Sequence, residues 1–128
     1  MKRILGRYEE TFFTLLRIVV GFTFSCHGAQ KLFGALGGAK ADTPLMMLAG
    51  VIEFGGGLLI LVGLFTGIAA FLASGEMAVA YFKAHAPHSL FPIVNHGELA
   101  VVYCFLFLYI AAHGAGRWSI DGFKRRSP

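Results

Sequence analysis

Ionisable side chains interrupt an otherwise apolar sequence at a few places, and chemistry can occur there. Glu53 and Glu76 can hold or release protons. Lys31 can neutralise a carboxylate, and His27 can titrate near neutral pH. Such groups can together bind the polar head of a small molecule or exchange protons with it. The residues predicted to form one ligand-binding or polar cavity are His27, Gln30, Lys31, Glu53, Glu76, Lys83, His85, Asn95, His96 and Glu98.

The spacing of these residues indicates helical faces. His27 and Lys31 occupy positions i and i+4, so they share one face of a helix. Glu76 and Lys83 lie two turns apart on one face, which puts the glutamate about 10 Å deeper along the helix than the lysine. A polar stripe of this kind in an apolar helix lines a cavity, a proton relay or a subunit contact, and the spacing leaves all three open.

The two glutamates lie in the middle of apolar segments. A charged carboxylate at the centre of a bilayer costs about 3 kcal/mol on insertion scales, so each must be protonated, paired or turned to a polar interior. Small residues surround both, including Gly55 and Gly56 beside Glu53, and Gly75 beside Glu76. Close helix packing could make them interhelical hydrogen-bond donors and acceptors, or they could bind a ligand or handle protons.

Four apolar segments must position these side chains, at residues 11–33, 44–65, 66–86 and 97–113. Each is close to the ~20 residues that cross a hydrocarbon core as a helix. Hydrophobic residues make up 56% of the 128 positions and charged residues only 14%, too few charges to cover a soluble domain. The sequence therefore predicts an all-α integral membrane four-helix bundle, formed by residues 1–128 as one transmembrane domain in contact with the lipid bilayer.

The basic residues predict the orientation of this bundle. Seven lysines and arginines lie in the two terminal segments, whereas three lie in the first and third connections. By the positive-inside rule both termini are cytoplasmic, which agrees with an even number of spans in a multi-pass protein. The net charge of +4 then reflects topology and lipid contact, and no nucleic-acid partner is expected.

The connection between the third and fourth segments is rich in histidine, but it predicts no metal site. His85, His88 and His96 are chemically suitable ligands, yet Pro87 and Pro92 make the segment irregular and its spacing fits no known ligand set. The predicted role of the loop is to cover the cavity. Asn95 is predicted to cap the following helix, with a glutamate three residues on as in a capping box.

Arg17 is a cation inside the first apolar segment, near its predicted cytoplasmic end. It can extend to the interface or find a buried partner. Asp121 is the acidic residue that follows the last apolar segment, so an Arg17–Asp121 ion pair is predicted to tie the tail to the bundle. Trp118 is typical of an interfacial anchor.

Several motifs together resemble the DoxX family of small bacterial membrane proteins: RIVVGFTFSCHGAQKLFG, AGVIEFGGGLLILVGLFTGIAAF, GEMAVAYFKAHAP, NHGELAVVYCFLFL and GAGRWSIDG. The resemblance covers about residues 16–122. It implies a four-helix bundle in the bacterial inner membrane, and roles in quinone-linked sulfur oxidation, thiol homeostasis beside soluble enzymes, or quinone detoxification. The positions that match the family pattern are Arg17, His27, Gly28, Lys31, Glu53, Gly56, Gly63, Glu76, Pro87, Asn95, Glu98 and Asp121.

Three functions follow as hypotheses. The first is an accessory or ligand-binding membrane component, with quinone as the candidate ligand, in redox, thiol or sulfur metabolism. The sequence contains no C-x-x-C, haem motif or nucleotide-binding loop, so this interpretation favours an accessory role over an autonomous oxidoreductase. The second is a scaffold for soluble redox enzymes. The third is transport of a small solute or protons, which would require a homo-oligomer because four helices are few for a carrier.

Overall fold

The chain is all-helical in the computed structural model, which describes residues 2–126. Four long helical segments follow a short 3-10 turn, η1 (Gly6–Tyr8). They are α1 (Glu9–Phe33), then α2 (Pro44–Val51) continuing through the π-helical turn η2 (Ile52–Gly56) into α3 (Gly57–Val62), then α4 (Thr66–Ala80) continuing into the π-helical turn η3 (Tyr81–His85), and finally α6 (Glu98–His113). Two short helices, α5 (Pro92–Asn95) and α7 (Ile120–Arg126), flank α6.

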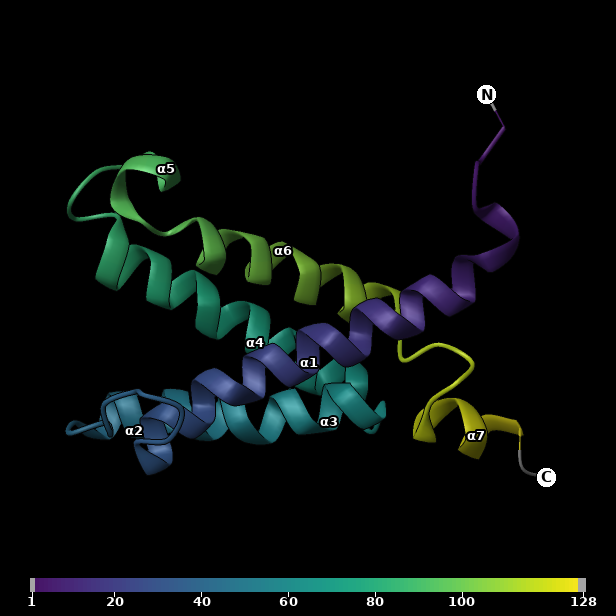
Figure 1. Cartoon of the computed structure of the whole chain (residues 1–128), viewed down its shortest axis with the longest axis horizontal. Helices are drawn as coiled ribbons and strands as arrows, with labels where there is room; N and C mark the ends of the chain where they lie inside the picture. The colour runs from purple at the N-terminus through teal and green to yellow at the C-terminus, as the bar shows by residue number, and fades with distance from the viewer. Residues whose placement is uncertain (1, 127–128) are drawn as a thin grey trace.

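The long helices pack in two pairs. α1 lies along α2, η2 and α3, and α4 lies along α6. Figure 1 shows the two pairs separating toward the end of the molecule that is opposite both termini. The order of elements and their bounds match the predicted apolar segments to within a few residues, and the predicted all-α class is confirmed.

Aromatic side chains between α1 and α6 join the two pairs. Phe24 of α1 and Phe107 of α6 are fully buried, and their ring centroids are 4.6 Å apart. Tyr103, also buried, lies 5.3 Å from Phe24 and stacks on Phe107 at 5.5 Å. Aromatic contacts of this geometry contribute about 0.5–1.5 kcal/mol each beyond their buried area, so this cluster holds the pairs together near the middle of the molecule.

Glycines let α1 approach the second helical segment at backbone distance. A Cβ added to Gly28 would lie 2.2 Å from the backbone nitrogen of Phe54, and one added to Gly57 would lie 2.6 Å from the nitrogen of Ser25. Both distances are far below van der Waals contact, so only glycine fits at these two positions. The crossing sets α1 directly against the π-helical turn η2.

The outer surface of the helices is apolar. Large hydrophobic side chains such as Ile68, Phe71 and Phe105 are mostly exposed. The stretches Gly6–Phe33 and Pro44–Val62 are long and apolar enough to cross a membrane, and α6 is a shorter apolar helix. An exposed apolar surface of this extent fits contact with lipid.

Arg17 does not form the predicted ion pair with Asp121, because its donors are used elsewhere. The guanidinium is buried and donates to four backbone carbonyls: Ile60 (3.0 Å) and Leu61 (3.3 Å) in the last turn of α3, and Ala115 and Trp118 (3.1 Å) after α6. Carbonyls at a helix C-terminus lack partners within the helix, and they carry partial negative charge. The tail is therefore fixed to the bundle through its backbone.

Asp121 instead binds the start of α4. Its carboxylate accepts hydrogen bonds from the backbone N–H groups of Phe65 (3.1 Å) and Thr66 (3.0 Å), where a helix N-terminus has unpaired donors. Burial acts to raise the pKa of the Asp121 carboxyl, but these hydrogen bonds and the positive charge of Lys124 together outweigh it and leave the pKa below its ordinary value. Phe65 has a left-handed backbone, with φ of 49°, and this carboxylate holds it in place.

Candidate functional site

A cavity of about 1040 Å³ lies between the two helix pairs, in the half of the molecule away from the termini. α1, α2 with η2, α4 with η3, and α6 all contribute to its wall. Most of the lining is apolar, and Phe24, Met46, Leu72, Met77 and Leu99 are examples. The polar members are His27, Lys31, Glu53, Glu76, Lys83, His85, His96 and Tyr103.

An ion pair lines the cavity. The Nζ of Lys31 donates to both carboxylate oxygens of Glu53, at 2.9 and 2.7 Å. The Glu53 side chain is 3% exposed and that of Lys31 is 23% exposed. Removing one partner of such a pair would leave an uncompensated buried charge, so the two residues depend on each other.

The local sequence explains why Glu53 reaches Lys31. Glu53 lies in the π-helical turn η2, whose sequence IEFGG ends in two glycines of low helix propensity. A π-helical turn is wider than an α-helical one and re-aims its side chains, and such turns occur frequently at functional sites. Because Gly28 lets α1 pack directly on Phe54, Lys31, one turn further along α1, comes within hydrogen-bonding distance of the carboxylate.

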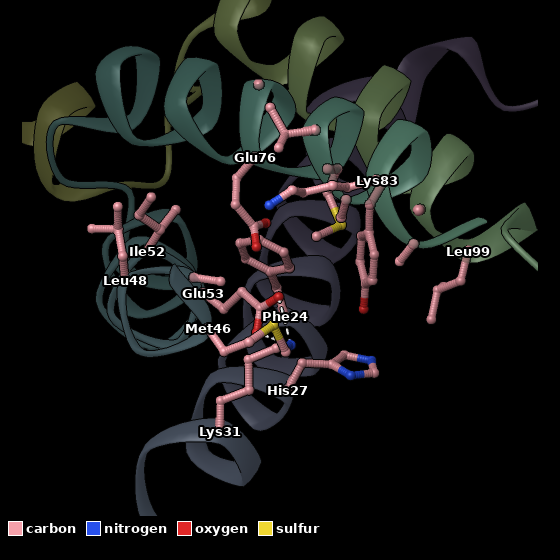
Figure 2. A pocket seen from close by; sticks show the side chains of 18 of the residues that line it. Phe24, His27, Lys31, Met46, Leu48, Ile52, Glu53, Glu76, Lys83 and Leu99 are labelled. Atoms are coloured by element: carbon pink, nitrogen blue, oxygen red, sulfur yellow. Dashed lines mark hydrogen bonds and ion pairs between the residues drawn. The ribbon is translucent and has the colours of Figure 1, made fainter. Parts of the chain in front are cut away.

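Glu76 enters the cavity from the opposite wall. It lies on α4, and Figure 2 shows its side chain pointing toward Glu53. The Oε2 atom of Glu76 is buried and receives no hydrogen bond from a donor within residues 2–126. The site therefore contains two carboxyl groups and one directly bound ammonium.

Lys83 lines the same cavity, but it forms no ion pair with Glu76 within 4.0 Å among the described residues. The predicted polar stripe assumed a regular helix from Glu76 to Lys83. The π-helical turn η3, which contains Lys83, changes this register. Lys83 is an exposed residue.

Three histidines stand around the cavity. His27 packs edge-on against Tyr103, with centroids 6.1 Å apart. His85 places Nδ1 3.0 Å from the carbonyl oxygen of Asn95, which connects η3 to α5. His96 is exposed and has a left-handed backbone with φ of 60°, a conformation that is uncommon for a residue other than glycine.

Gln30, Asn95 and Glu98 were also predicted to line the cavity, but they do not. Gln30 donates to the carbonyl of Leu36 at 3.2 Å and so orders the loop after α1. Asn95 is buried and binds the loop itself, donating to Ser89 at 2.6 Å and to the Tyr81 hydroxyl at 3.1 Å. Gln30 and Asn95 thus hydrogen-bond to connecting segments, whose course helical periodicity does not predict.

The predicted capping box of α6 is also wrong. The N-cap of α6 is Gly97, and no side chain caps the helix. Asn95 ends the short helix α5, and its Oδ1 accepts a hydrogen bond from the Gly97 N–H at 2.8 Å. Glu98 is exposed in the first turn of α6, where its charge interacts favourably with the helix dipole.

Within residues 2–126 no three side chains among His, Cys, Asp and Glu lie close enough to hold a metal ion. The groups that could bind an organic head are the imidazole of His27, the ammonium of Lys31 and the carboxyl of Glu76, surrounded by apolar wall that could hold a hydrocarbon tail. This arrangement can bind and orient an amphipathic molecule and exchange protons with it.

Tyr103 is a cavity residue that the sequence prediction missed. Its hydroxyl donates to Thr23 Oγ1 at 2.8 Å, so the ring is fixed between α1 and α6. A tyrosine in the middle of an apolar helix is a usable signal, because a buried phenol needs a partner. The apolar wall from α2, including Met46 and Leu48, has no signal in the sequence beyond hydrophobicity.

Comparison with known proteins gives two findings. The DoxX family model matches residues 12–86. An uncharacterized protein of Haemophilus influenzae is 44% identical over 125 residues, which cover 91% of this chain and 93% of the relative. No solved structure matches the chain. The segment matched by the family model contains Lys31, Glu53 and Glu76, and it ends before α6.

Proposed function

Because the chain belongs to the DoxX family of membrane proteins, we propose that it binds a small amphipathic molecule of the quinone class in the cavity between its two helix pairs. The polar head would lie at Lys31, Glu53 and Glu76, and the hydrocarbon tail along the apolar wall. The role is that of a binding or accessory component in redox, thiol or sulfur metabolism.

One observation carries this proposal: a large, mostly apolar cavity with a charged cluster in its interior. Its volume of about 1040 Å³ is sufficient for a ligand with a ring and a tail. Ligand sites typically combine apolar walls with a few converging polar groups, and helices meet at such sites in bundles. The two π-helical turns on its border, η2 and η3, are further support.

The proposal includes four membrane crossings, by α1, by the segment from α2 to α3, by the segment from α4 to η3, and by α6. The chain would form a single domain of four membrane helices in the bacterial inner membrane with both termini in the cytoplasm. Two facts support this topology: both termini lie at the same end in Figure 1, and the terminal segments contain most of the basic residues. The cavity would then open near the periplasmic face.

The experiment is a calorimetric titration of ligand into the purified protein in a mild detergent. The ligands are a decyl-tailed benzoquinone and its hydroquinone. Lys31→Met and Glu76→Gln are expected to weaken binding of the better ligand at least tenfold, the equivalent of about 1.4 kcal/mol. Matched controls are Lys40→Met and Glu98→Gln, which change the same residue types outside the cavity and should bind like the unmodified protein.

Other outcomes would favour the other two hypotheses. If all four variants bind equally, the cavity is not the site. If removal of residues 123–128 abolishes capture of a soluble redox enzyme while ligand binding is absent, the scaffold function is favoured. Proton or solute flux in liposomes that depends on Glu53 and Glu76 would favour transport by a homo-oligomer.

A further inference from the structure

The two carboxyl groups of the cavity differ in how their acceptor atoms are used. Both oxygens of Glu53 bind the Lys31 ammonium, at 2.9 and 2.7 Å. The residue Glu76 is only partly buried, but its Oε2 atom is buried and no described residue donates to it. Figure 2 shows the Glu76 side chain extending into the cavity toward Glu53, which cannot act as a donor while it is ionised.

The other donors around the cavity do not reach Glu76. The Tyr103 hydroxyl donates to Thr23, and Nδ1 of His85 lies at the Asn95 carbonyl. Lys83 and His27 line the cavity without a hydrogen bond or ion pair to Glu76 among residues 2–126. A buried acceptor that stays unpaired is costly, so whatever occupies the cavity gains by donating to it.

We infer that the cavity selects molecules whose head carries a hydroxyl group, and that Glu76 accepts the hydrogen bond from this hydroxyl. This inference rests on the proposed function. A hydroquinone or another phenol fits the requirement, whereas the corresponding quinone or ether offers only acceptors.

The inference is tested with three molecules of nearly the same shape: a decyl-tailed hydroquinone, its dimethyl ether and the parent quinone. Calorimetry on the purified full-length protein measures the affinity for each under anaerobic conditions. The hydroquinone is expected to bind about 10- to 100-fold more tightly than the ether or the quinone, since only it can satisfy the buried acceptor.

Glu76→Leu removes the acceptor and replaces it with an apolar side chain that is one atom shorter. In this variant the hydroquinone is expected to bind about as tightly as the ether, so that the preference disappears. The affinity for the ether itself should change little, which would show that the cavity remains intact. Glu98→Leu is the matched control and should retain the preference. If Glu76→Leu does not fold, Glu76→Gln, whose neutral amide is a weaker acceptor than a carboxylate, should lower the affinity for the hydroquinone at least tenfold and so reduce the preference.

Two results would overturn this inference and leave the proposed function standing. One is a quinone or ether that binds as tightly as the hydroquinone, and the other is a preference for the hydroquinone that survives Glu76→Leu. A quinone that binds more tightly would indicate that Glu76 is protonated and donates. If none of the three molecules binds, the proposed function itself is wrong and the inference fails with it.

Discussion

Two cations on α1, one buried and one partly exposed, meet different partners at the two ends of the molecule. Arg17 is 2% exposed and donates to backbone carbonyls of α3 and of the segment after α6. Lys31, about 21 Å further along the helix by its rise, binds the side chain of Glu53 at the edge of a cavity. One cation fixes the backbone, and the other compensates a carboxylate that a ligand could approach.

The chemistry of the two side chains fits these roles. A guanidinium presents several donors in a rigid plane and is weakly hydrated, so it can bridge carbonyls from separate segments inside the protein. An ammonium is a compact charge that retains water readily and can exchange one partner for another. The end with Arg17, Asp121 and both termini is here named the closed end, and we expect it to determine stability. The end with Lys31 and Glu76 is named the cavity end, and it is where we propose that the ligand binds.

The largest expected effect separates stability from binding at the closed end. Arg17→Met removes the buried donor that joins the carbonyls of Ile60 and Ala115, and we expect it to destabilise the protein by about 3 kcal/mol or more. Thermal unfolding in detergent should show a decrease in Tm of roughly 10 °C. Arg7→Met, at an exposed position, is the control. Ligand affinity of the folded fraction should be unchanged, and a selective loss of affinity would contradict the division between the two ends.

The second effect concerns the crossing that builds the cavity end. Gly28→Ala would place a methyl group 2.2 Å from the Phe54 nitrogen, and separating the helices should cost about 1–3 kcal/mol. Because the same crossing brings Lys31 to Glu53, ligand affinity should fall as well.

Gly55→Ala is the matched control for this crossing, since nothing lies within 4 Å of a Cβ at that position. It should change neither Tm nor affinity by a large amount, and a slight gain in stability is expected from helix propensity. Equal losses in Gly28→Ala and Gly55→Ala, measured by the same two assays, would show that glycine flexibility in the π-helical turn matters more than close packing.

The sequence predicts the helices well because their signal is local. Apolar runs of sufficient length specify the four long segments, and helical spacing places His27 and Lys31 on one face. The partner of Lys31 is another matter: it depends on the approach of α1 to η2, which involves backbone atoms of Phe54 that no pattern of side chains reveals.

The wrong predictions for Arg17, Asn95 and Glu98 also have their cause in the backbone. Charge complementarity suggested Asp121 for Arg17, but backbone carbonyls compete for a guanidinium and are invisible in a sequence. Asn95 and Glu98 were assigned to the cavity because helix ends meet there. Their directions are decided by the backbone of residues 86–97, including the left-handed His96, rather than by periodicity.

A smaller effect at the closed end is expected from Asp121→Ala. The change removes the acceptor for the N–H groups of Phe65 and Thr66, and loss of a cap typically costs about 1 kcal/mol. Hydrogen exchange at the start of α4 should become faster, while exchange around Lys31 and affinity for the ligand stay the same. Faster exchange at both ends would mean that the two ends are coupled.

This contribution of Asp121 has a defined pH dependence. Its pKa in the folded protein is lowered, so the stabilisation is present above the unfolded value of about 3.9 and is lost as the pH falls through the folded value. The difference in Tm between the unmodified protein and Asp121→Ala should therefore be constant from about pH 8 to 5 and shrink below about pH 4. A difference that already shrinks near pH 6 would show that another group, such as a histidine, controls the closed end.

The smallest expected effect tests where the boundary between the two ends lies. Tyr103→Phe removes the hydrogen bond to Thr23 but keeps the ring that packs on Phe24, so a loss of about 0.5–1.5 kcal/mol is expected. Tyr109→Phe, on the exposed side of α6, is the matched control and should have no effect. Because the Tyr103 hydroxyl donates to the protein, its removal should leave the preference for hydroquinone intact. A lower preference in Tyr103→Phe would place this hydroxyl among the groups that contact the ligand and extend the cavity end to the aromatic cluster.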